Sequence, residues 1–276
     1  MSHFLNKRKR SAAVMLLSLL LLAGIAAAGT WTGSERLGVD LDARNQAPSL
    51  MHLFGTDWLG RDMFARTVKG LSLSLWVGVI AAFTSSLIAF VLSVAAVWNS
   101  WMDRMVTFLI DLFLSVPHIV LLLLISFAFG GGFIGVTVGL ALTHWPSLAR
   151  VLRAEIMQVK HTEYTQISRR MGKPGWWIAV HHYLPHLLPQ LFIGFILLFP
   201  HAVLHEAAIT FLGFGLPEEQ PAIGVILSES MQYLSMGMWW LAFFPGLSLL
   251  LMATAFEALG RNIRRWMDPF YGQKGS

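Results

Sequence analysis

Residues 71–98 read LSLSLWVGVIAAFTSSLIAFVLSVAAVW, a run without a single acidic or basic side chain. A transmembrane helix needs about 20 consecutive, mostly apolar residues, so this segment is long enough to cross a bilayer with some tilt. Hydrophobic residues make up 55% of the whole chain, and Asp, Glu, Lys and Arg only 13%, about half the usual charged share of a soluble domain. The sequence therefore predicts a polytopic membrane protein.

Outward from this run, five more apolar segments predict an all-α fold with about six transmembrane helices. They are Ser11–Thr30, Met105–Phe129, Phe133–Ala149, about His186–Leu212 and about Trp239–Gly260. The segment that follows residues 71–98 is interrupted by Pro117. A cleaved signal peptide competes with the first segment, but the apolar run there is long, and Ala26–Ala28 is the only sign of a cleavage site.

The basic residues predict the orientation in the membrane. Six spans leave both termini on one side; if that side is the cytoplasm, fifteen of the twenty Lys and Arg residues face it, in accord with the positive-inside rule. The net charge of +5 is then explained by topology rather than by nucleic-acid binding. The chain divides into a basic N-terminus with the first span (1–30), an extracytoplasmic loop (31–70), a transmembrane core (71–260) that includes a cytoplasmic loop (150–185), and a cytoplasmic tail (261–276).

Two absences in the sequence restrict the chemistry of the chain. It contains no cysteine, which excludes disulfides, Cys-ligated zinc, iron–sulfur clusters and a Cys nucleophile. It also lacks the G-x-x-x-x-G-K-[ST] phosphate-binding loop. We therefore expect no catalytic residues, no ATP site of that kind and no bound cofactor on this chain.

The cytoplasmic loop contains the stretch EYTQISRRMG at residues 163–172, followed nine residues later by HYLP at residues 182–185. Gly at a helix end and Pro just beyond it are stop signals. Residues 163–173 are thus predicted to form a short helix against the membrane. Without further information, a solvated cytoplasmic loop is the alternative.

The spacing of this loop resembles the Glu-Ala-Ala loop of ABC-importer permeases. Gln166-Ile167-Ser168 stands at the Glu-Ala-Ala positions, Gly172 and Leu184-Pro185 match the family pattern, and His182 replaces an Ile. The resemblance implies a coupling helix that docks on a cytoplasmic ATPase. The residues it assigns to this coupling are Glu163, Gln166, Ile167, Ser168, Gly172, Leu184 and Pro185.

A second motif precedes residues 71–98: the stretch HLFGTDWLGRDMFAR at residues 52–66. It closely resembles the H-x-x-G-T-D-x-x-G-R-D-x-x-x-R stretch of the dipeptide, oligopeptide and nickel group of ABC permeases, in its C-type subunit. We expect a structural role for it outside the membrane, because an Arg can pair with two carboxylates and Gly permits tight turns. The residues concerned are Gly55, Thr56, Asp57, Gly60, Arg61 and Asp62. Two weaker matches are FLGFG at residues 211–215 and the terminal Asp268-Pro269.

The family resemblance also implies the assembly in which the chain works. The expected partners are a second, B-type permease chain, two cytoplasmic ATPases that bind ATP and Mg, an extracytoplasmic solute-binding protein and the lipid of a bacterial inner membrane. No nucleic acid is expected among them. An ion-coupled secondary transporter and an intramembrane metallohydrolase are the alternative classes; the second lacks the Glu inside the pair that H-E-x-x-H requires.

Ionisable side chains inside the predicted spans are costly, and so they indicate function. His201 and His205 are one helical turn apart on one face, with Glu206 adjoining. Imidazole suits Ni, Cu and Zn. The alternative is that each His forms hydrogen bonds across the bundle. Weaker candidates for the translocation path are His144, Asp111 and His118.

The cargo expected from these residues is a transition metal. The pair His201 and His205 resembles a pair in nickel-type permeases, which favours nickel or another transition metal, as the free ion or a chelate. Dipeptides or oligopeptides are the alternative cargo.

Overall fold

The computed structural model describes residues 2–32 and 37–267, and within them the only strand-like pairing is an isolated bridge between Thr56 and Asp62. The predicted all-α fold is confirmed. Five helices are long and apolar enough to cross a membrane. They are α1 (Ser2–Trp31), α2 (Met63–Ala96), α5 (Gly132–Lys160), α8 (Leu184–Phe211) and α10 (Trp240–Met267).

The predicted span Met105–Phe129 consists of two helices, and the predicted interruption at Pro117 lies between them. α3 (Ser100–Ser115) and α4 (His118–Ala128) are bent by 100° relative to each other. Pro117 has no N–H to donate and disfavours helix at the residue before it, and Val116 is indeed extended. If this bent pair counts as one span, the described part of the chain has six.

The loop that is predicted to be cytoplasmic contains more helix than expected. α5 continues beyond Ala149 to Lys160. α6 (Glu163–Arg170) ends three residues before the predicted end at Lys173, because Gly172 has a left-handed φ of 76° that ends the helix. α7 (Gly175–Ile178) and the π-helix η3 (Ala179–Tyr183) then lead without a break into α8.

Two short elements outside the membrane were not predicted. The 3₁₀-helix η2 (Leu41–Ala43) lies in the loop before α2, and α9 (Ile223–Leu234) lies between α8 and α10. α9 has only 12 residues, too few for a span of about 20. The terminal pair Asp268-Pro269 lies outside the described residues.

Helix α2 lies at the centre of the bundle, packed against α1, α5 and α8. Its approach to α8 is close: a Cβ added at Gly78 would lie 2.5 Å from Cγ2 of Val203. Small residues allow helix backbones to approach in membranes, where dispersion replaces the hydrophobic effect as the driving force. Gly78 is therefore a packing requirement rather than a flexible point.

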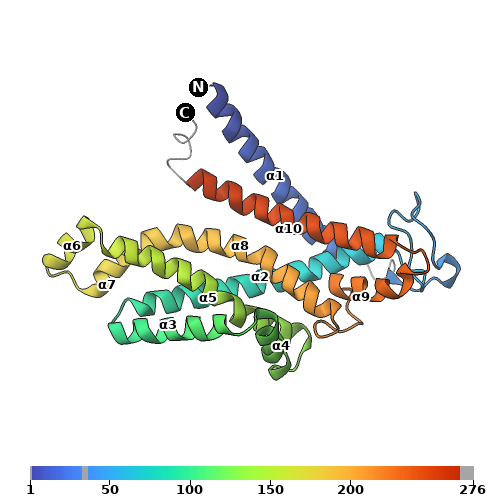
Figure 1. Cartoon of the computed structure of the whole chain (residues 1–276). Coiled ribbons are helices and arrows are strands. Elements are labelled where there is room, and N and C mark those ends of the chain that lie inside the picture. Colours follow the sequence, from blue (N-terminus) through green and yellow to red (C-terminus); the bar gives the residue numbers. More distant parts are fainter. Residues whose placement is uncertain (1, 33–36, 268–276) are drawn as a thin grey trace.

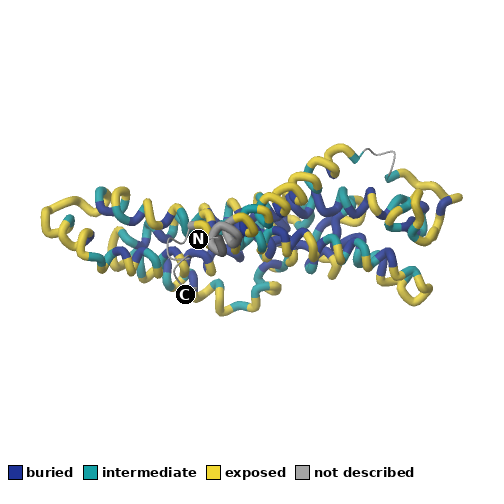
Figure 2. Tube along the Cα trace, turned by 90° about the horizontal axis from the view of Figure 1, so that it is seen from above, coloured by how far each residue is buried: buried dark blue, intermediate teal, exposed yellow. Residues whose placement is uncertain are grey.

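The two ends of the bundle differ. α6 and α7 lie at one end, and residues 37–62 with α9 lie at the other (Figure 1). α1 begins and α10 ends on the side away from residues 37–62, as the predicted topology requires. Exposed residues line the outside of the long helices (Figure 2), and many are large and apolar, for example Leu17 and Phe83. Such a surface suits lipid.

Candidate functional site

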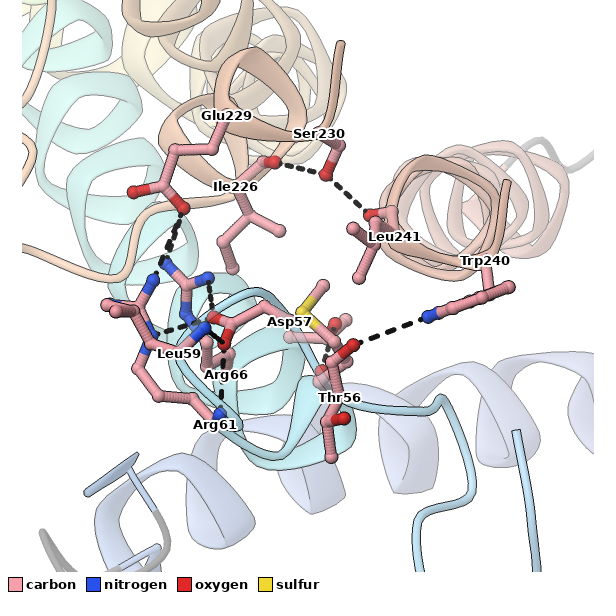
Figure 3. A network of polar contacts seen from close by, with 12 residues as sticks. Thr56, Asp57, Leu59, Arg61, Arg66, Ile226, Glu229, Ser230, Trp240 and Leu241 are labelled. Carbon is pink, nitrogen blue, oxygen red and sulfur yellow. Dashed lines mark hydrogen bonds and ion pairs between the residues drawn. The ribbon is translucent and has the colours of Figure 1, made fainter. Parts of the chain in front are cut away.

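The loop before α2 is organised around the buried carboxylate of Asp57 (Figure 3). Its Oδ1 accepts hydrogen bonds from the backbone N–H groups of Leu59 and Arg61, both at 2.9 Å. Its Oδ2 accepts from Nε of Arg61 and Nη1 of Arg66, both at 2.7 Å. Four donors to one carboxylate make a rigid unit, because charge-assisted bonds are short and strong.

Arg66 connects this network to helix α9. Its Nη2 donates to Oε2 of Glu229 in α9 at 2.8 Å, and Nη2 of Arg61 lies 3.7 Å from the same oxygen (Figure 3). The ring of Trp58 stacks on Tyr233 of α9 at a centroid distance of 4.7 Å. The loop is thus fixed to α9 by both ion pairs and aromatic packing.

The remaining motif residues shape the backbone of this loop. Thr56 is buried, and its hydroxyl donates to the carbonyl of Ala43 while accepting from the N–H of Gln46. Gly60 has a φ of 76°, and a Cβ there would lie 1.6 Å from the carbonyl oxygen of Asp40. Gly55 also has a positive φ. These positions require Gly on steric grounds.

We expected Arg61 to lie between Asp57 and Asp62, but Asp62 does not pair with Arg61. It is the N-cap of α2, where Oδ1 accepts from the N–H of Ala65 at 2.8 Å, and its Oδ2 lies 2.9 Å from Nδ1 of His52. Arg61 pairs with Asp57 and Glu229 instead. The expected Arg between two carboxylates exists, but one of the two acidic partners comes from α9.

A cavity of about 490 Å³ lies among α5, α8 and the start of α4. Histidines from three helices line it: His118 of α4, His144 of α5, and His201 and His205 of α8. The ring centroid of His118 lies 4.6 Å from that of His144 and 4.4 Å from that of His205. The bend at Pro117 therefore places His118 against two helices distant in sequence.

The remaining polar lining of this cavity contains no acidic residue: it consists of Thr143, Ser147, Gln190 and Arg264.

Two of the ring tautomers are set by the backbone. Nδ1 of His144 lies 2.9 Å from the carbonyl oxygen of Leu140, and Nδ1 of His205 lies 2.7 Å from that of His201. A carbonyl only accepts, so each Nδ1 carries the proton, and in the neutral ring Nε2 has a lone pair. Nε2 of His144 is buried without a partner.

These histidines do not form a closed metal site. Within residues 2–32 and 37–267, no group of three or more His, Asp or Glu side chains is arranged to hold a metal ion. Glu206 does not face the cavity: it is fully buried, and Oε1 accepts from Thr210 at 2.9 Å. Asp111 is largely exposed, and its Oδ1 lies 3.3 Å from Nη2 of Arg150. Of the six candidates, the structure brings together the four histidines and leaves both acids out.

The short helix α6 exposes an apolar surface at the end of the bundle. Ile167 and Met171 are more than half exposed, as is Trp176 of α7. Two polar contacts connect α6 to the segment that leads into α8. Oγ of Ser168 lies 2.9 Å from Nε2 of His182, and the hydroxyl of Tyr164 lies 3.2 Å from Nε2 of His186.

The other proposed coupling residues surround this surface. Glu163 begins α6, the amide of Gln166 donates to the carbonyl of His161, and Leu184 and Pro185 open α8. Their coupling role stays a prediction.

Sequence reasoning missed three residues of the outer network: Arg66, Glu229 and Trp240, whose indole N–H donates to the carbonyl of Thr56 at 3.4 Å. Arg66 had a signal, because it is the last residue of the HLFGTDWLGRDMFAR motif. The sequence gives no signal for Glu229 or Trp240, because Glu229 lies 163 positions from Arg66 and Trp240 lies 184 positions from Thr56.

Apolar spans, a histidine-lined cavity between them and an exposed short helix at one end are the organisation of a membrane permease. The sequence profile described as "Binding-protein-dependent transport system inner membrane component" matches residues 85–269, more than half of the chain. The chain belongs to this family of permease subunits of ABC transporters, which are not enzymes. Such multi-pass permeases of the inner membrane work with a partner permease, ATPases and a binding protein.

Individual relatives support the same group. The dipeptide transport system permease protein of Bacillus subtilis (strain 168) is 31% identical over 265 residues, which cover 95% of this chain and 83% of that protein. A protein of Brucella suis biovar 1 (strain 1330), named as a peptide transport system permease, is 32% identical over 263 residues, covering 95% and 88%. Their names refer to peptides, so they give no support to the expected preference for nickel.

A chain of the inward-facing MetNI methionine ABC transporter has the same fold. The TM-score is 0.56, the match covers 73% of this chain and 97% of that chain, and sequence identity is 22%.

Proposed function

We propose that this chain forms half of the translocation path of an importer for short peptides. The observation that carries the proposal is the similarity, along 95% of the chain, to a dipeptide transport system permease protein. The histidine-lined cavity is the segment of the path that this chain contributes. Its volume of about 490 Å³ lies within the roughly 300–1,000 Å³ of small-molecule sites.

The lining of the cavity supports a peptide cargo. Arg264 and Gln190 offer N–H donors to a terminal carboxylate, since Arg favours that geometry. Nε2 of His205 accepts hydrogen bonds from N–H groups of a passing chain. Weak contacts of both kinds allow cargo to enter and to leave again.

A transition-metal chelate is the second candidate cargo, favoured by one observation. Metal-bound histidines usually donate their other ring N–H to a carbonyl or carboxylate, and His144 and His205 both donate to a backbone carbonyl. Because the described residues do not enclose an ion, a chelator would have to supply most of the ligands. The peptide proposal needs no such addition.

We further infer how the chain is placed and driven. α6, with Glu163, Gln166, Ile167, Ser168 and Gly172, docks on one of two ATPases that bind ATP and Mg, and Leu184-Pro185 connects it to α8. Both termini then lie in the cytoplasm. The support is the exposed apolar surface of α6 together with the excess of basic residues on this side. The second permease is of the B type, and an extracytoplasmic binding protein delivers the cargo.

The cargo is tested in proteoliposomes that contain the complete importer with its binding protein. ATPase stimulation and uptake are measured with a dipeptide alone, with Ni(II) alone and with both together. We expect stimulation by the dipeptide and none by Ni(II) alone. Replacing His205 with Phe removes an acceptor worth about 1 kcal/mol, which raises the half-saturating dipeptide concentration about fivefold.

The double variant His201→Gln, His205→Gln separates the two cargoes. Gln keeps hydrogen-bonding groups but is a poor ligand for Ni(II), so dipeptide uptake should stay within about twofold of the parent. If Ni(II) stimulates the parent and the double variant loses that response, the metal candidate replaces the peptide. A dipeptide without effect on the parent contradicts the proposal directly.

A further inference from the structure

Two adjoining pockets lie on another face of the bundle, at the end that carries α6 and α7. One, of about 230 Å³, has walls of aliphatic and aromatic side chains from α2, α5 and the η3 segment. The other, of about 170 Å³, is polar and is lined by the end of α2, the start of α3 and the last turns of α5. Val97 and Ile156 belong to both walls. The apolar and the polar pocket therefore adjoin each other.

This face points away from the histidine-lined cavity. α5 contributes His144, Ser147, Leu148 and Val151 to that cavity, and Arg153, Ile156, Met157 and Lys160 to the polar pocket. At 3.6 residues per turn, the centres of these two sets lie about 180° apart around the helix. Under the proposed function the cavity faces the path shared with the second permease, so the two pockets face outward.

Charge in the polar pocket favours an anion. Arg153 pairs with Asp103, and Lys160 adds one more positive charge. The side chain of Lys160 makes no hydrogen bond or ion pair with another residue of the described ranges. Its ammonium is thus available to a ligand from outside the chain.

The neighbouring aromatic residues place the polar pocket at the depth of lipid headgroups. Trp98 is 79% exposed and Trp101 is 59% exposed, on either side of Asn99 and Ser100, which line the pocket. Exposed Trp side chains gather at membrane–water interfaces, where their rings lie at headgroup level. An apolar pocket adjoining this level, with a free Lys beside it, fits one molecule with an anionic head and a hydrocarbon tail.

We propose that the two pockets together bind one anionic phospholipid of the surrounding membrane. One acyl chain occupies the apolar pocket, and the phosphate lies against Lys160, beside the Arg153–Asp103 pair. The acyl chain contacts Ala179 and Val180 of η3 and Leu184 of α8 on one side, and Val94 of α2 on the other. The lipid thus connects η3 and the start of α8 to α2, the central helix of the bundle. This role is independent of the cargo.

The test uses the complete importer in nanodiscs of phosphatidylcholine, with and without phosphatidylglycerol. Bound phosphatidylglycerol is counted by native mass spectrometry. Lys160→Gln should reduce its affinity about fivefold, because one Lys at an anionic surface contributes about 1 kcal/mol. Val180→Trp fills the apolar pocket and should reduce it as well. Lys9→Gln, an exposed Lys near the start of α1, is the control and should keep the parent's affinity.

Two results overturn the proposal. In the first, Lys160→Gln and Lys9→Gln retain the same amount of phosphatidylglycerol, which means that the membrane surface attracts the lipid without a site. In the second, a Cys at Met157, which is 47% exposed in the parent, crosslinks to the second permease chain, which means that protein covers this face. Neither result affects the peptide proposal, which is measured by cargo uptake.

Discussion

At the scale of single residues, Asp57 holds together the loop before α2, residues 37–62. It is completely buried, yet four donors satisfy it, and two of them are the charged side chains of Arg61 and Arg66. A buried charge without partners costs several kcal/mol, whereas a fully paired one is tolerated. The same carboxylate also holds Arg66 in the position that reaches Glu229.

Removing the charge of Asp57 should therefore destabilise the protein. We expect Asp57→Asn to cost about 3 kcal/mol, because it leaves the buried Arg66 without its closer partner. For a chain of this size that corresponds to a melting temperature lower by roughly 6–12 °C, measured by thermal unfolding of the purified permease in detergent. Asp42→Asn, at an exposed position of the same loop, is the control. Equal melting temperatures of the two variants contradict a structural role for Asp57.

At the scale of elements, the proposed coupling helix α6 depends on how it ends. Gly172 has a φ of 76°, and a Cβ there would meet no atom within 4 Å. The restriction is therefore conformational and not steric. Left-handed backbone costs roughly 1–2 kcal/mol for ordinary residues, and a β-branched residue tolerates it worst, while Asn tolerates it well.

Gly172→Val should consequently separate ATP hydrolysis from transport. The strained turn displaces α6 relative to α7, so cargo uptake should fall about tenfold for a strain of 1.4 kcal/mol, while basal ATPase activity persists. Gly172→Asn should transport like the parent. Uptake and ATPase rates are measured together in proteoliposomes. Normal uptake by the Val variant would show that the conformation at the end of α6 has no role in coupling.

Some elements of the fold could be predicted from the sequence, and others could not. The spans were found because twenty apolar residues in a row are a local property, and the break at Pro117 because Pro lacks an N–H. The 100° angle at that break was beyond prediction, since packing sets it. α9 was missed because its 12 residues neither span a membrane nor stand out in composition.

The candidate site was predictable to a similar degree. His201 and His205 could be placed on one face from their spacing alone. Their neighbours His118 and His144 were known only as polar residues in spans, because the helices that carry them meet through tertiary packing. Glu206 was assigned to the histidines by adjacency in sequence, but the next position on a helix points about 100° away, and it bonds Thr210 instead.

At the scale of the whole molecule, the predicted orientation has a direct test. The chain has no cysteine, so a single introduced thiol reports on its own position. Leu50 is 97% exposed in the outer loop and Met171 is 72% exposed beside α6. In intact cells, a membrane-impermeant maleimide should label Leu50→Cys, and it should label Met171→Cys only after permeabilisation. The opposite pattern reverses the topology and excludes ATPase docking at α6.

The continuity of α7, η3 and α8 has a mechanical consequence. One helical rod runs from Gly175 to Phe211 over 37 residues, roughly 55 Å at 1.5 Å per residue. Beside its first residues lies the exposed surface of α6, and His201 and His205 lie in its second half. Near its far end, the hydroxyl of Thr210 accepts from the N–H of Leu216 at 3.1 Å. A stiff lever of this length transmits a tilt at one end to the other without any relay of side chains. Its weakest points are the π-helical turn and the prolines at 189 and 200, which bracket the stretch of α8 that leads to the histidines.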